Sequence, residues 1–505
     1  MNLYYITTNT SSAVKLCDIP VVEYVELYND LTARMEDSRF HIAHYFATEI
    51  EQGLKFYIIL LDDERSEVLI SSFIPDYYSE EGLASLTAIH PQFHPFEREI
   101  HELYDVEFNQ HPWLKPLRFP HNRRDKLSTM DSYPFYTIEG DDLHEVNVGP
   151  IHAGIIEPGA FRFICNGEQV LHLEIALGYQ HRGVETEMLR DNNRLRQTLI
   201  AESIAGDTAI GHTTAYAELI EKLSAGNIDD NLALERMIAL ELERIAMHIA
   251  DTGALATDIG FQLYQVACEA LRTVTINTTQ AWCGNRFGKS MIRPLGSNHP
   301  LTAEKIELIR KNVVDVRRRY NEIREDILEA PTLLVRFEQC GLVPKAEMRR
   351  IGGVGMAARS SGVERDIRAT HPSGYYATRL HHTPVTMSDG DVMSRLSTRM
   401  DEVLQSTDYI LNALEHYTPS GEIPAPDYNA PLMPEALSFG LVEGWRGEIC
   451  HVALTNKEGK IEKYKVKDPS LHNWLGLAIA VRSEGISDFP INNKSFNLSY
   501  CGHDL

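Results

Sequence analysis

The sequence has few cysteines and no paired cysteine motif. Its 505 residues include seven cysteines, and none of them form a Cys-x-x-Cys pair. We therefore expect no iron–sulfur cluster or structural zinc held by this chain alone. The odd number of cysteines, and a start at Met1 without the basic and apolar segments of a signal peptide, indicate a reducing compartment.

Long apolar runs and an excess of basic residues are also missing. The nearest approach to a membrane-spanning run is residues 474–481, which is far below the ~20 residues needed to cross a bilayer. If the protein works at a membrane, we expect a partner to hold it there. The formal net charge of -24 argues against a nucleic-acid partner, because phosphate recognition needs a basic surface.

The chain has ample apolar sequence to build large cores. An apolar fraction of 43% in 505 residues exceeds the needs of one ordinary domain, and we expect two domains. Near the start, residues 24–35 predict a helix, and residues 56–61 and 68–73 predict strands. This pattern is typical of an α+β domain. His41 and His44 have helix-like spacing but no third ligand nearby, so we expect packed or solvent-facing histidines.

Residues 94–108 contain the densest charge cluster of this first part. Glu97, Arg98 and Glu99 are followed by Leu103-Tyr104 and then by Phe108, with His111-Pro112 close behind. This run resembles the signature of the smaller hydrophilic subunit of respiratory complex I and of its counterparts in related hydrogenases. The cluster either pins a loop through paired hydrogen bonds or forms a solvated helix face.

A change of composition separates this part from the rest. Residues 118–126 are locally basic and residues 139–145 locally acidic, without apolar periodicity. We therefore predict an α+β domain over residues 1–125 that is similar to the smaller hydrophilic subunit of complex I, a linker over residues 126–145, and a second domain over residues 146–505.

The second domain begins with a glycine-rich stretch. Residues 149–163 and 178–185 resemble the opening of the large subunits of membrane-bound, energy-converting [NiFe]-hydrogenases and, more distantly, their homologue in the hydrophilic arm of complex I. The alternation of Phe161, Phe163 and Cys165 predicts a hairpin strand. Residues 192–286 predict a long helical region, and its polar stretch at residues 242–251 resembles the buried charged helix of that family.

The metal-binding motifs of the resembled hydrogenases are present here without their sulfur ligands. Residues 201–216 follow the pattern Glu-x-x-Cys-Gly-x-Cys-x-x-x-His, with Glu202, Gly206 and His212 in register. The resemblance implies that four thiolate positions are occupied by Ala205, Thr208, Ser499 and Gly502. Hydroxyl groups bind soft metals poorly, and Ala and Gly have no side-chain donor atom. We therefore expect no metal ligands in this chain.

Two glycine-rich turns invite a nucleotide-binding interpretation. Gly284 to Ser290 ends in Gly-Lys-Ser, but the phosphate-loop spacing is one residue short and a helix precedes it where a strand is required. Residues 352–355 lack a dinucleotide fingerprint. We expect no nucleotide site at either turn.

The resemblance implies an electron-transfer and coupling subunit of a membrane-bound complex related to energy-converting hydrogenases and complex I. The expected partners are a small iron–sulfur subunit similar to the one in complex I, a ferredoxin-like iron–sulfur subunit, and antiporter-like membrane subunits. An iron–sulfur cluster of the small subunit would face the vacated cavity. We expect this cavity to be lined by acidic and imidazole groups able to relay protons, namely Glu185, Asp207, Thr208, His212, Arg359, His503 and Asp504.

Two alternatives remain open. In complex I the quinone is held by a His and a Tyr whose positions correspond here to Pro158 and Gly206, so a quinone would have to use other groups. His152 and Tyr216 are the candidates for that role. The other alternative is a non-catalytic scaffold for the iron–sulfur subunit. Hydrogen turnover by this chain is not expected.

These observations predict an α+β N-terminal domain followed by a mainly α-helical, hydrogenase large-subunit-like domain with small β-hairpins. We expect the chain to bind no cofactor alone, with quinone as the alternative. Its expected location is peripheral, at the cytoplasmic face of the cell membrane.

Overall fold

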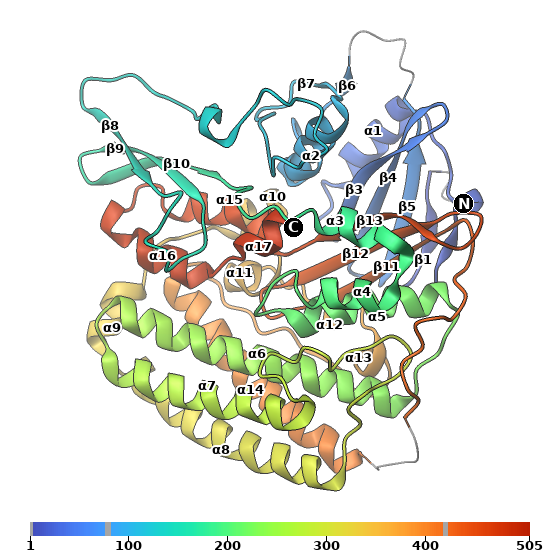
Figure 1. The fold of residues 1–505 in the computed structure, drawn as a ribbon. Helices are drawn as coiled ribbons and strands as arrows, with labels where there is room; N and C mark the ends of the chain where they lie inside the picture. Colours follow the sequence, from blue (N-terminus) through green and yellow to red (C-terminus); the bar gives the residue numbers. More distant parts are fainter. Residues whose placement is uncertain (1–3, 76–81, 418–422) are drawn as a thin grey trace.

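The computed structural model describes residues 4–75, 82–417 and 423–505, and it combines helices with small, mainly antiparallel sheets (Figure 1). The strands are β1 (Ile6–Thr8), β2 (Val14–Lys15), β3 (Phe40–Ile50), β4 (Gly53–Asp62), β5 (Glu67–Phe73), β6 (Leu83–Ala84), β7 (Phe108–Asn109), β8 (Leu143–Val148), β9 (Ala160–Asn166), β10 (Gln169–Ala176), β11 (Ala436–Glu443), β12 (Glu448–Thr455) and β13 (Ile461–Lys467). The helices are α1 (Tyr24–Arg34), α2 (His94–Tyr104), α3 (Val184–Leu189), α4 (Arg194–Ala201), α5 (Ala209–Leu223), α6 (Asp230–Asp258), α7 (Gln262–Cys283), α8 (Ala303–Leu328), α9 (Pro331–Phe337), α10 (Lys345–Arg350), α11 (Gly355–Ser360), α12 (Ile367–Thr370), α13 (Gly374–Thr378), α14 (Val392–His416), α15 (Ser470–Ala480), α16 (Phe489–Phe496) and α17 (Tyr500–Asp504).

The N-terminal sheet has the antiparallel order β1-β5-β4-β3 and is covered on both faces. On β4, Phe56, Ile58 and Leu60 face α1 and α2, whereas Tyr57 and Ile59 face β11 and β12. Burial of both faces explains why this strand is a continuous apolar run rather than an alternating one. The helix and the two strands expected between residues 24 and 73 are confirmed.

His41 and His44 both lie on β3, so their helix-like spacing was misleading. Both side chains are buried, as expected for packed histidines. The spacing of three residues passes through a register irregularity between Ile42 and His44, where β3 pairs with β4. A bulge of this kind re-aims side chains within a strand.

The second sheet has the order β13-β12-β11-β2 and joins the two ends of the chain. Strand β2, near the N-terminus, pairs with β11 through Val14 opposite Leu437. The faces of the two sheets share one apolar core. The residues assigned from sequence to the first and second domains are therefore packed against each other, and the domain boundaries themselves stay a prediction.

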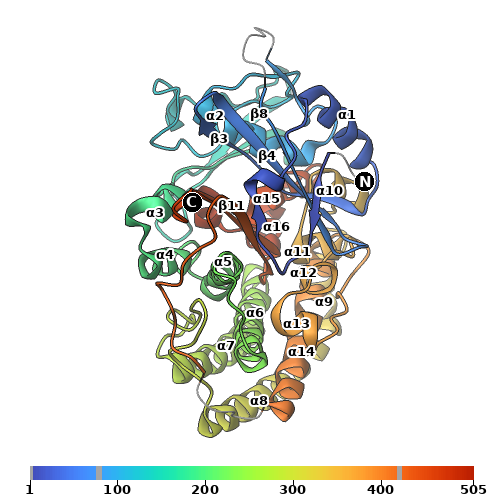
Figure 2. The ribbon, with the colours of Figure 1, turned by 90° about the vertical axis from the view of Figure 1, so that its right-hand side faces the viewer.

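Four long helices, α6, α7, α8 and α14, lie side by side below the sheets (Figures 1 and 2). Their shared core contains Leu242 of α6, Leu271 of α7, Val316 of α8 and Leu396 of α14. The expected helical region 192–286 is divided into α4 to α7, and the break between α5 and α6 contains Gly226. In the described chain, no helix is both long and apolar enough to cross a membrane.

The expected hairpin strand at residues 161–165 is confirmed as β9, which pairs with β8 and β10. β8 starts at Leu143, inside the segment predicted as a linker. Upstream of β8, the Tyr136 amide N–H donates to the Glu174 carboxylate at 2.6 Å, so this segment is attached to the sheet.

Helix α5 packs closely on β11, and Gly440 permits that approach. A Cβ atom at Gly440 would lie 1.9 Å from the carbonyl oxygen of Ala215. We expect Gly440→Ala to lower the free energy of unfolding by about 3 kcal/mol, because the helix backbone must move. Chemical denaturation measures this loss. Gly206→Ala is the control, since a Cβ there meets no atom within 4 Å. Equal stability of the two variants would contradict the close packing.

Candidate functional site

The start of α5, the β11–β12 turn and the C-terminal helix α17 meet at one place. We call the polar residues there the α5 cluster: Asp207, His212, Arg446, His451 and Asp468. Their side chains come from the loop before α5, α5 itself, the β11–β12 turn, β12 and the residue after β13. Figure 1 shows α17 and the C-terminus near the strands that carry them.

His212 is fully buried and lies between two polar partners. Its Nε2 is 3.1 Å from Asp468 Oδ2, and its Nδ1 is 3.0 Å from His451 Nε2. Asp468 accepts a further hydrogen bond from the Ser470 amide, and His451 Nδ1 lies 2.7 Å from the Tyr464 hydroxyl. Four ionisable side chains thus form one continuous hydrogen-bonded line.

The pKa values of Asp468, His451 and Tyr464 determine which group donates and which accepts in each hydrogen bond of that line. Burial raises the pKa of Asp468, but His212, Arg446 and the Ser470 amide together more than offset it, so the pKa is lowered and the group is a carboxylate. Burial lowers the pKa of His451 far below its usual value and raises that of Tyr464. Because a carboxylate only accepts, His212 Nε2–H donates to Asp468. His451 Nε2–H then donates to His212, and the Tyr464 hydroxyl donates to His451.

Arg446 pairs with Asp207 beside this line, and its charge also helps to lower the pKa of Asp468. Its two terminal nitrogens each lie 2.7 Å from an oxygen of Asp207, and its guanidinium stacks on Trp445 at 3.9 Å. Burial raises the pKa of Asp207, and the adjacent Arg446 more than offsets this effect and lowers it. The start of α5 is held by Glu243, which accepts from the Ile210 and Gly211 amides.

Three of the four positions to which the resemblance assigns thiolates lie beside this cluster, namely Thr208, Ser499 and Gly502. Thr208 Oγ1 accepts from Trp445 Nε1 at 3.1 Å, and Ser499 Oγ accepts from the Gly502 amide at 2.9 Å as the cap of α17. A Cβ atom at Gly502 would lie only 2.4 Å from Asp468 Oδ2. These residues, with Ala205, supply no soft donor, and a carboxylate fills the space beside Gly502. The donor set does not fit a nickel–iron centre.

Glu185, another expected cavity residue, belongs to a second group. We call it the interface cluster: Glu99, Arg118, Glu185 and Lys465. The Lys465 ammonium lies 2.7 Å from Glu99 and 2.6 Å from Glu185, and Arg118 pairs with Glu99. Burial would raise the pKa of Glu99, but Lys465 and Arg118 outweigh it and hold the pKa at about 2. The Glu97-Arg98-Glu99 motif therefore contributes to a buried ion-pair network rather than to a solvated helix face.

Arg359 lies in a third group, within the helical bundle. Its guanidinium contacts Glu402 at 2.6 Å and Glu443 at 2.7 Å, with Asp366 at 3.2 Å. Glu402 also accepts from His248 at 2.8 Å. Every one of these side chains is buried, which identifies the group as an ion-pair network within the core.

The remaining expected residues are held locally. His503 Nδ1 lies 2.8 Å from Asp504, which itself accepts from the Gly178 and Gln180 amides. The structure therefore places the seven expected cavity residues in several separate polar groups instead of one cavity.

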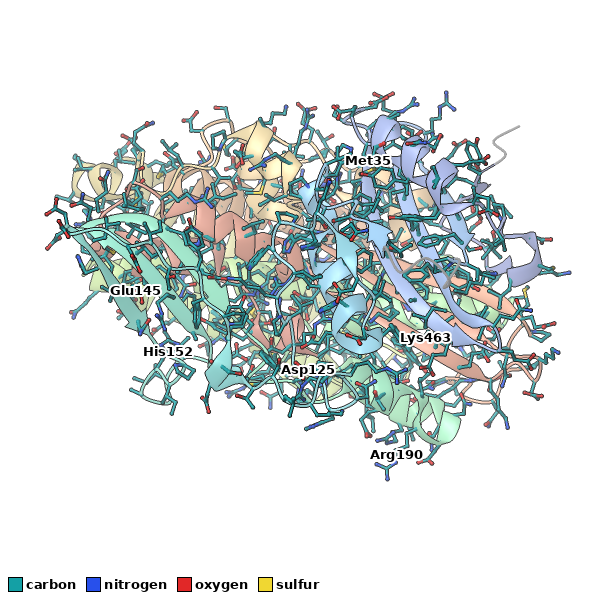
Figure 3. All side chains as sticks on the ribbon, turned by 90° about the horizontal axis from the view of Figure 1, so that it is seen from above. Met35, Asp125, Glu145, His152, Arg190 and Lys463 are labelled. Atoms are coloured by element: carbon teal, nitrogen blue, oxygen red, sulfur yellow. The ribbon has the colours of Figure 1, made fainter. Side chains whose placement is uncertain are left out.

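The two quinone candidates, His152 and Tyr216, do not lie in one site. Tyr216 is buried, and its hydroxyl donates to Gln197 at 3.0 Å. His152 lies in the β8–β9 loop, with Nε2 at 2.9 Å from the Gly159 carbonyl. Figure 3 shows His152 at the outer end of the hairpin, on the opposite side of the molecule from Lys463.

Sequence reasoning assigned no role to Asp468, His451 and Lys465. Signals for them exist in the strands. On β13, Tyr464 and Val466 join an apolar core, while Lys465 and Lys467 alternate with them and are equally buried. A buried lysine needs an acidic partner on a facing element, so this alternation indicates a polar interface between sheets.

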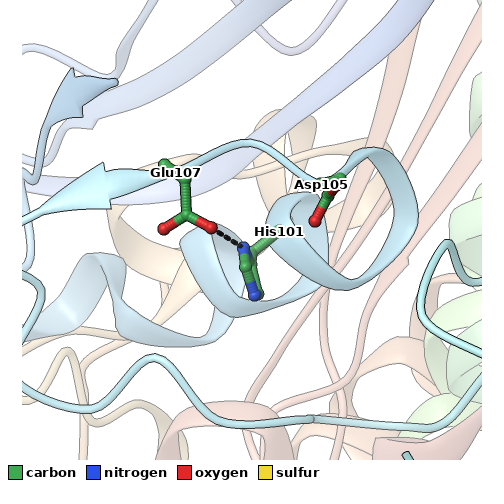
Figure 4. Close-up of side chains that lie close together, drawn as sticks. All are labelled: His101, Asp105 and Glu107. Carbon is green, nitrogen blue, oxygen red and sulfur yellow. Dashed lines mark ion pairs between the residues drawn. The ribbon is translucent and has the colours of Figure 1, made fainter. Parts of the chain in front are cut away.

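One group of three residues in the described chain has the spacing of a metal site: His101, Asp105 and Glu107. Figure 4 shows them around the C-terminal end of α2. His101 Nδ1 lies 3.0 Å from the Val106 carbonyl and 4.0 Å from Glu107. Because Nδ1–H donates to that carbonyl, Nδ1 has no lone pair for a metal and only Nε2 is left as a ligand atom, so we assign no metal to this group.

His472 on α15 predicts a pH dependence of stability. Its ring is buried and donates to the Gln92 carbonyl at 2.9 Å, and burial lowers its pKa to about 3. The unfolded chain has the ordinary value of about 6.5. The stability contribution is therefore complete above about pH 6.5 and is lost as pH falls toward the folded value. We expect a slope of about 1.4 kcal/mol per pH unit from this one group.

Denaturation across this pH range tests the expectation. His472→Gln keeps a donor but cannot titrate, so its slope should be smaller by about one proton. His144, exposed on β8, is the matched control for a histidine-to-glutamine change. An unchanged slope in His472→Gln would show that His472 is protonated in the folded protein.

Two separate parts of the chain match known protein families. Residues 16–126 match the family described as Respiratory-chain NADH dehydrogenase, 30 Kd subunit, and residues 258–438 match Respiratory-chain NADH dehydrogenase, 49 Kd subunit. Strands β3, β4 and β5 with α1 and α2 fall within the first match, and α7, α8 and α14 of the helical bundle fall within the second.

Individual relatives cover most of the chain. Membrane-bound hydrogenase subunit alpha of Pyrococcus furiosus is 28% identical over 69% of this chain and 84% of its own length. Formate hydrogenlyase subunit 5 of Escherichia coli is 25% identical over 91% of this chain and 81% of its own length. NADH-quinone oxidoreductase subunit 4 of Thermus thermophilus is 25% identical over 69% of this chain and 90% of its own length.

The chain thus matches, in one polypeptide, both the 30 Kd and the 49 Kd subunit families of the respiratory-chain NADH dehydrogenase over separate regions, and it is similar to membrane-bound hydrogenase and formate hydrogenlyase subunits.

Proposed function

We propose that this chain is an electron-transfer and coupling subunit in the hydrophilic arm of a membrane-bound, hydrogenase-related oxidoreductase complex, and that it has no nickel–iron centre of its own. The observation that carries the proposal is the α5 cluster. Where the related hydrogenases have thiolates, this chain has Ala205, Thr208, Ser499 and Gly502, and the Asp468 carboxylate occupies the space beside Gly502.

In this proposal the chain's own contribution is to move protons. The line from Tyr464 through His451 and His212 to Asp468 has no gap longer than 3.1 Å. Every donor in it points toward Asp468, so a proton delivered at the Tyr464 end reaches Asp468 by successive transfers between neighbours. Neutral imidazoles suit this task because each has one donor and one acceptor nitrogen.

Electrons in this proposal come from partner subunits. The partners are a small iron–sulfur subunit similar to the one in complex I, a ferredoxin-like iron–sulfur subunit and antiporter-like membrane subunits. The exposed β8–β9 loop supports a protein partner, because Ile151 and Ile155 are 81% and 86% exposed. We place the assembly at the cytoplasmic face of the membrane.

Metal analysis and redox assays of the purified complex test this proposal. We expect nickel well below one equivalent per chain, together with oxidoreductase activity toward ferredoxin or a quinone analogue. One nickel per chain, or hydrogen evolved by the isolated chain, would overturn it. If a quinone analogue is the acceptor, its reduction is measured in the variants His152→Ala and Tyr216→Phe. A loss of reduction in either variant would show that this chain holds the quinone.

A further inference from the structure

A cavity of about 320 Å³ lies between the part of the chain that matches the 30 Kd subunit family and segments from β10 and the C-terminal region, outside the α5 cluster. Its walls come from α2, the segment after β7, β10 and α15. Figure 1 shows α2 directly above α15 and beside β10. The volume falls at the lower end of the about 300–1,000 Å³ typical of sites for small organic ligands.

Two buried polar side chains in the wall have no hydrogen-bond partner for their ring nitrogens. His94 and Trp474 are each only 5% exposed, and neither the ring nitrogens of His94 nor the Trp474 indole nitrogen forms a hydrogen bond in the described structure. Burial lowers the pKa of His94 far below its usual value, so the ring is neutral and offers one donor and one acceptor. Buried donors without partners are rare in proteins and are costly. The cavity therefore presents N–H groups to an acceptor.

The charges around the cavity are predominantly positive. Among the described residues of its wall, Glu174 is the only acidic one, and Lys115 and Trp113 both bond to it, at 2.5 Å and 3.1 Å. Arg98 and Arg482 also line the cavity, and neither forms an ion pair in the described part of the chain. Arg98 binds the carbonyls of residues 115 and 116, and Arg482 is exposed at the rim. The free positive charge favours an anion.

The rest of the wall is apolar and aromatic. Trp113 stacks with His94 at a ring separation of 5.2 Å, and Trp474 lies on the α15 side with Leu471 and Leu475. Flat surfaces of this kind suit a planar apolar body. The buried donors suit a carbonyl or ring acceptor, and the arginines suit a terminal acidic group.

We propose that this cavity binds a planar organic anion, with its ring system between Trp113 and Trp474 and its acidic group toward Arg98 and Arg482. Such a ligand would connect α2 to α15, and so would tie the 30 Kd-like region to the C-terminal part of the chain. Carboxylate, sulfonate and phosphate esters of flat ring systems share this chemistry. The proposal is independent of the function proposed for the α5 cluster.

Fluorescence titration of the full chain with anilinonaphthalene sulfonate tests the proposal. Phenylnaphthylamine is the matched probe without the acidic group. We expect saturable binding of one sulfonate probe per chain, and roughly tenfold weaker binding of the uncharged probe. Trp474→Phe keeps the ring but removes the N–H, and Arg482→Gln removes a rim charge. Each should weaken the sulfonate probe severalfold, while only Trp474→Phe should also weaken the uncharged probe.

Two further variants complete the test. Ala478→Phe should fill the cavity and abolish binding, with thermal melting used to confirm that the variant folds. Arg318→Gln, exposed on α8, is the control and should bind like the original chain. Non-saturating binding, several equivalent sites, or binding unchanged in both Trp474→Phe and Arg482→Gln would overturn the proposal. Equal affinity for the two probes would overturn the assignment of an anion.

Discussion

Lys465→Met is expected to lower the free energy of unfolding by about 3–5 kcal/mol, the largest stability effect among the changes considered. The Lys465 side chain is only 2% exposed and lies between Glu99 on α2 and Glu185 on α3. Removing the ammonium leaves two neighbouring carboxylates without their shared partner, in a site where burial already opposes the charge of Glu99. The methionine side chain fills a similar volume, so the loss reports charge rather than a cavity.

The measurement is chemical denaturation at neutral pH. Glu49→Gln is the control, because its ion pair with Arg124 is exposed on both sides and its loss should cost no more than about 0.5 kcal/mol. A second readout is pH. The depressed pKa of Glu99 contributes stability above its unfolded value of about 4.5, and this contribution is lost as pH falls toward about 2. In Lys465→Met this acid dependence should shrink. If Lys465→Met were as stable as the original chain, solvent rather than Lys465 would be stabilising the charges of Glu99 and Glu185.

Asp468→Asn is expected to reduce the coupled redox activity of the complex by about two orders of magnitude. An asparagine cannot serve as the carboxylate end of the line from Tyr464, and its amide can reverse the hydrogen bond to His212. The assay is redox-driven proton transport in membrane vesicles containing the complex. The pH profile of the remaining activity should also shift, which a purely structural loss would not produce.

Three comparisons isolate the role of the line. Asp408→Asn on the surface of α14 is the control, because its pair with Arg317 is half-exposed. His212→Gln should produce a similar loss, and the double variant should be no worse, since both changes interrupt the same line. Asp468→Glu keeps the carboxylate and should restore part of the activity. Full coupling in Asp468→Asn and His212→Gln would refute the proton line, while leaving the question of the nickel–iron centre to the metal analysis.

Local sequence patterns predicted several elements well. The helix at residues 24–35 and the strands at residues 56–61 and 68–73 follow from short-range apolar patterning, which depends only on neighbours along the chain. The helix-like spacing of His41 and His44 was misleading because a bulge in β3 changes the strand period. Helix-like spacing over three residues cannot distinguish a helix from a bulged strand.

The candidate site was predicted in part. Asp207, Thr208 and His212 lie within five residues of each other along the chain, and the structure places His212 against Asp468, which also lies beside Gly502. Glu185, Arg359 and His503 were expected in the same cavity but lie in other groups. A motif tells which residues a family uses, whereas the partner of each charged group depends on which strands and helices face it.

By itself, the sequence determined which donor atoms stand at the motif positions: these positions hold no thiolates, whatever shape the chain adopts, because donor atoms are a property of the residue types. Only the tertiary structure decided what replaces them. Asp468, His451 and Lys465 come from strands far along the chain from α5 and α2, and their pairing exists because the two sheets and the C-terminal helix pack together. Burial in that packing is also what forces each charge to find a partner.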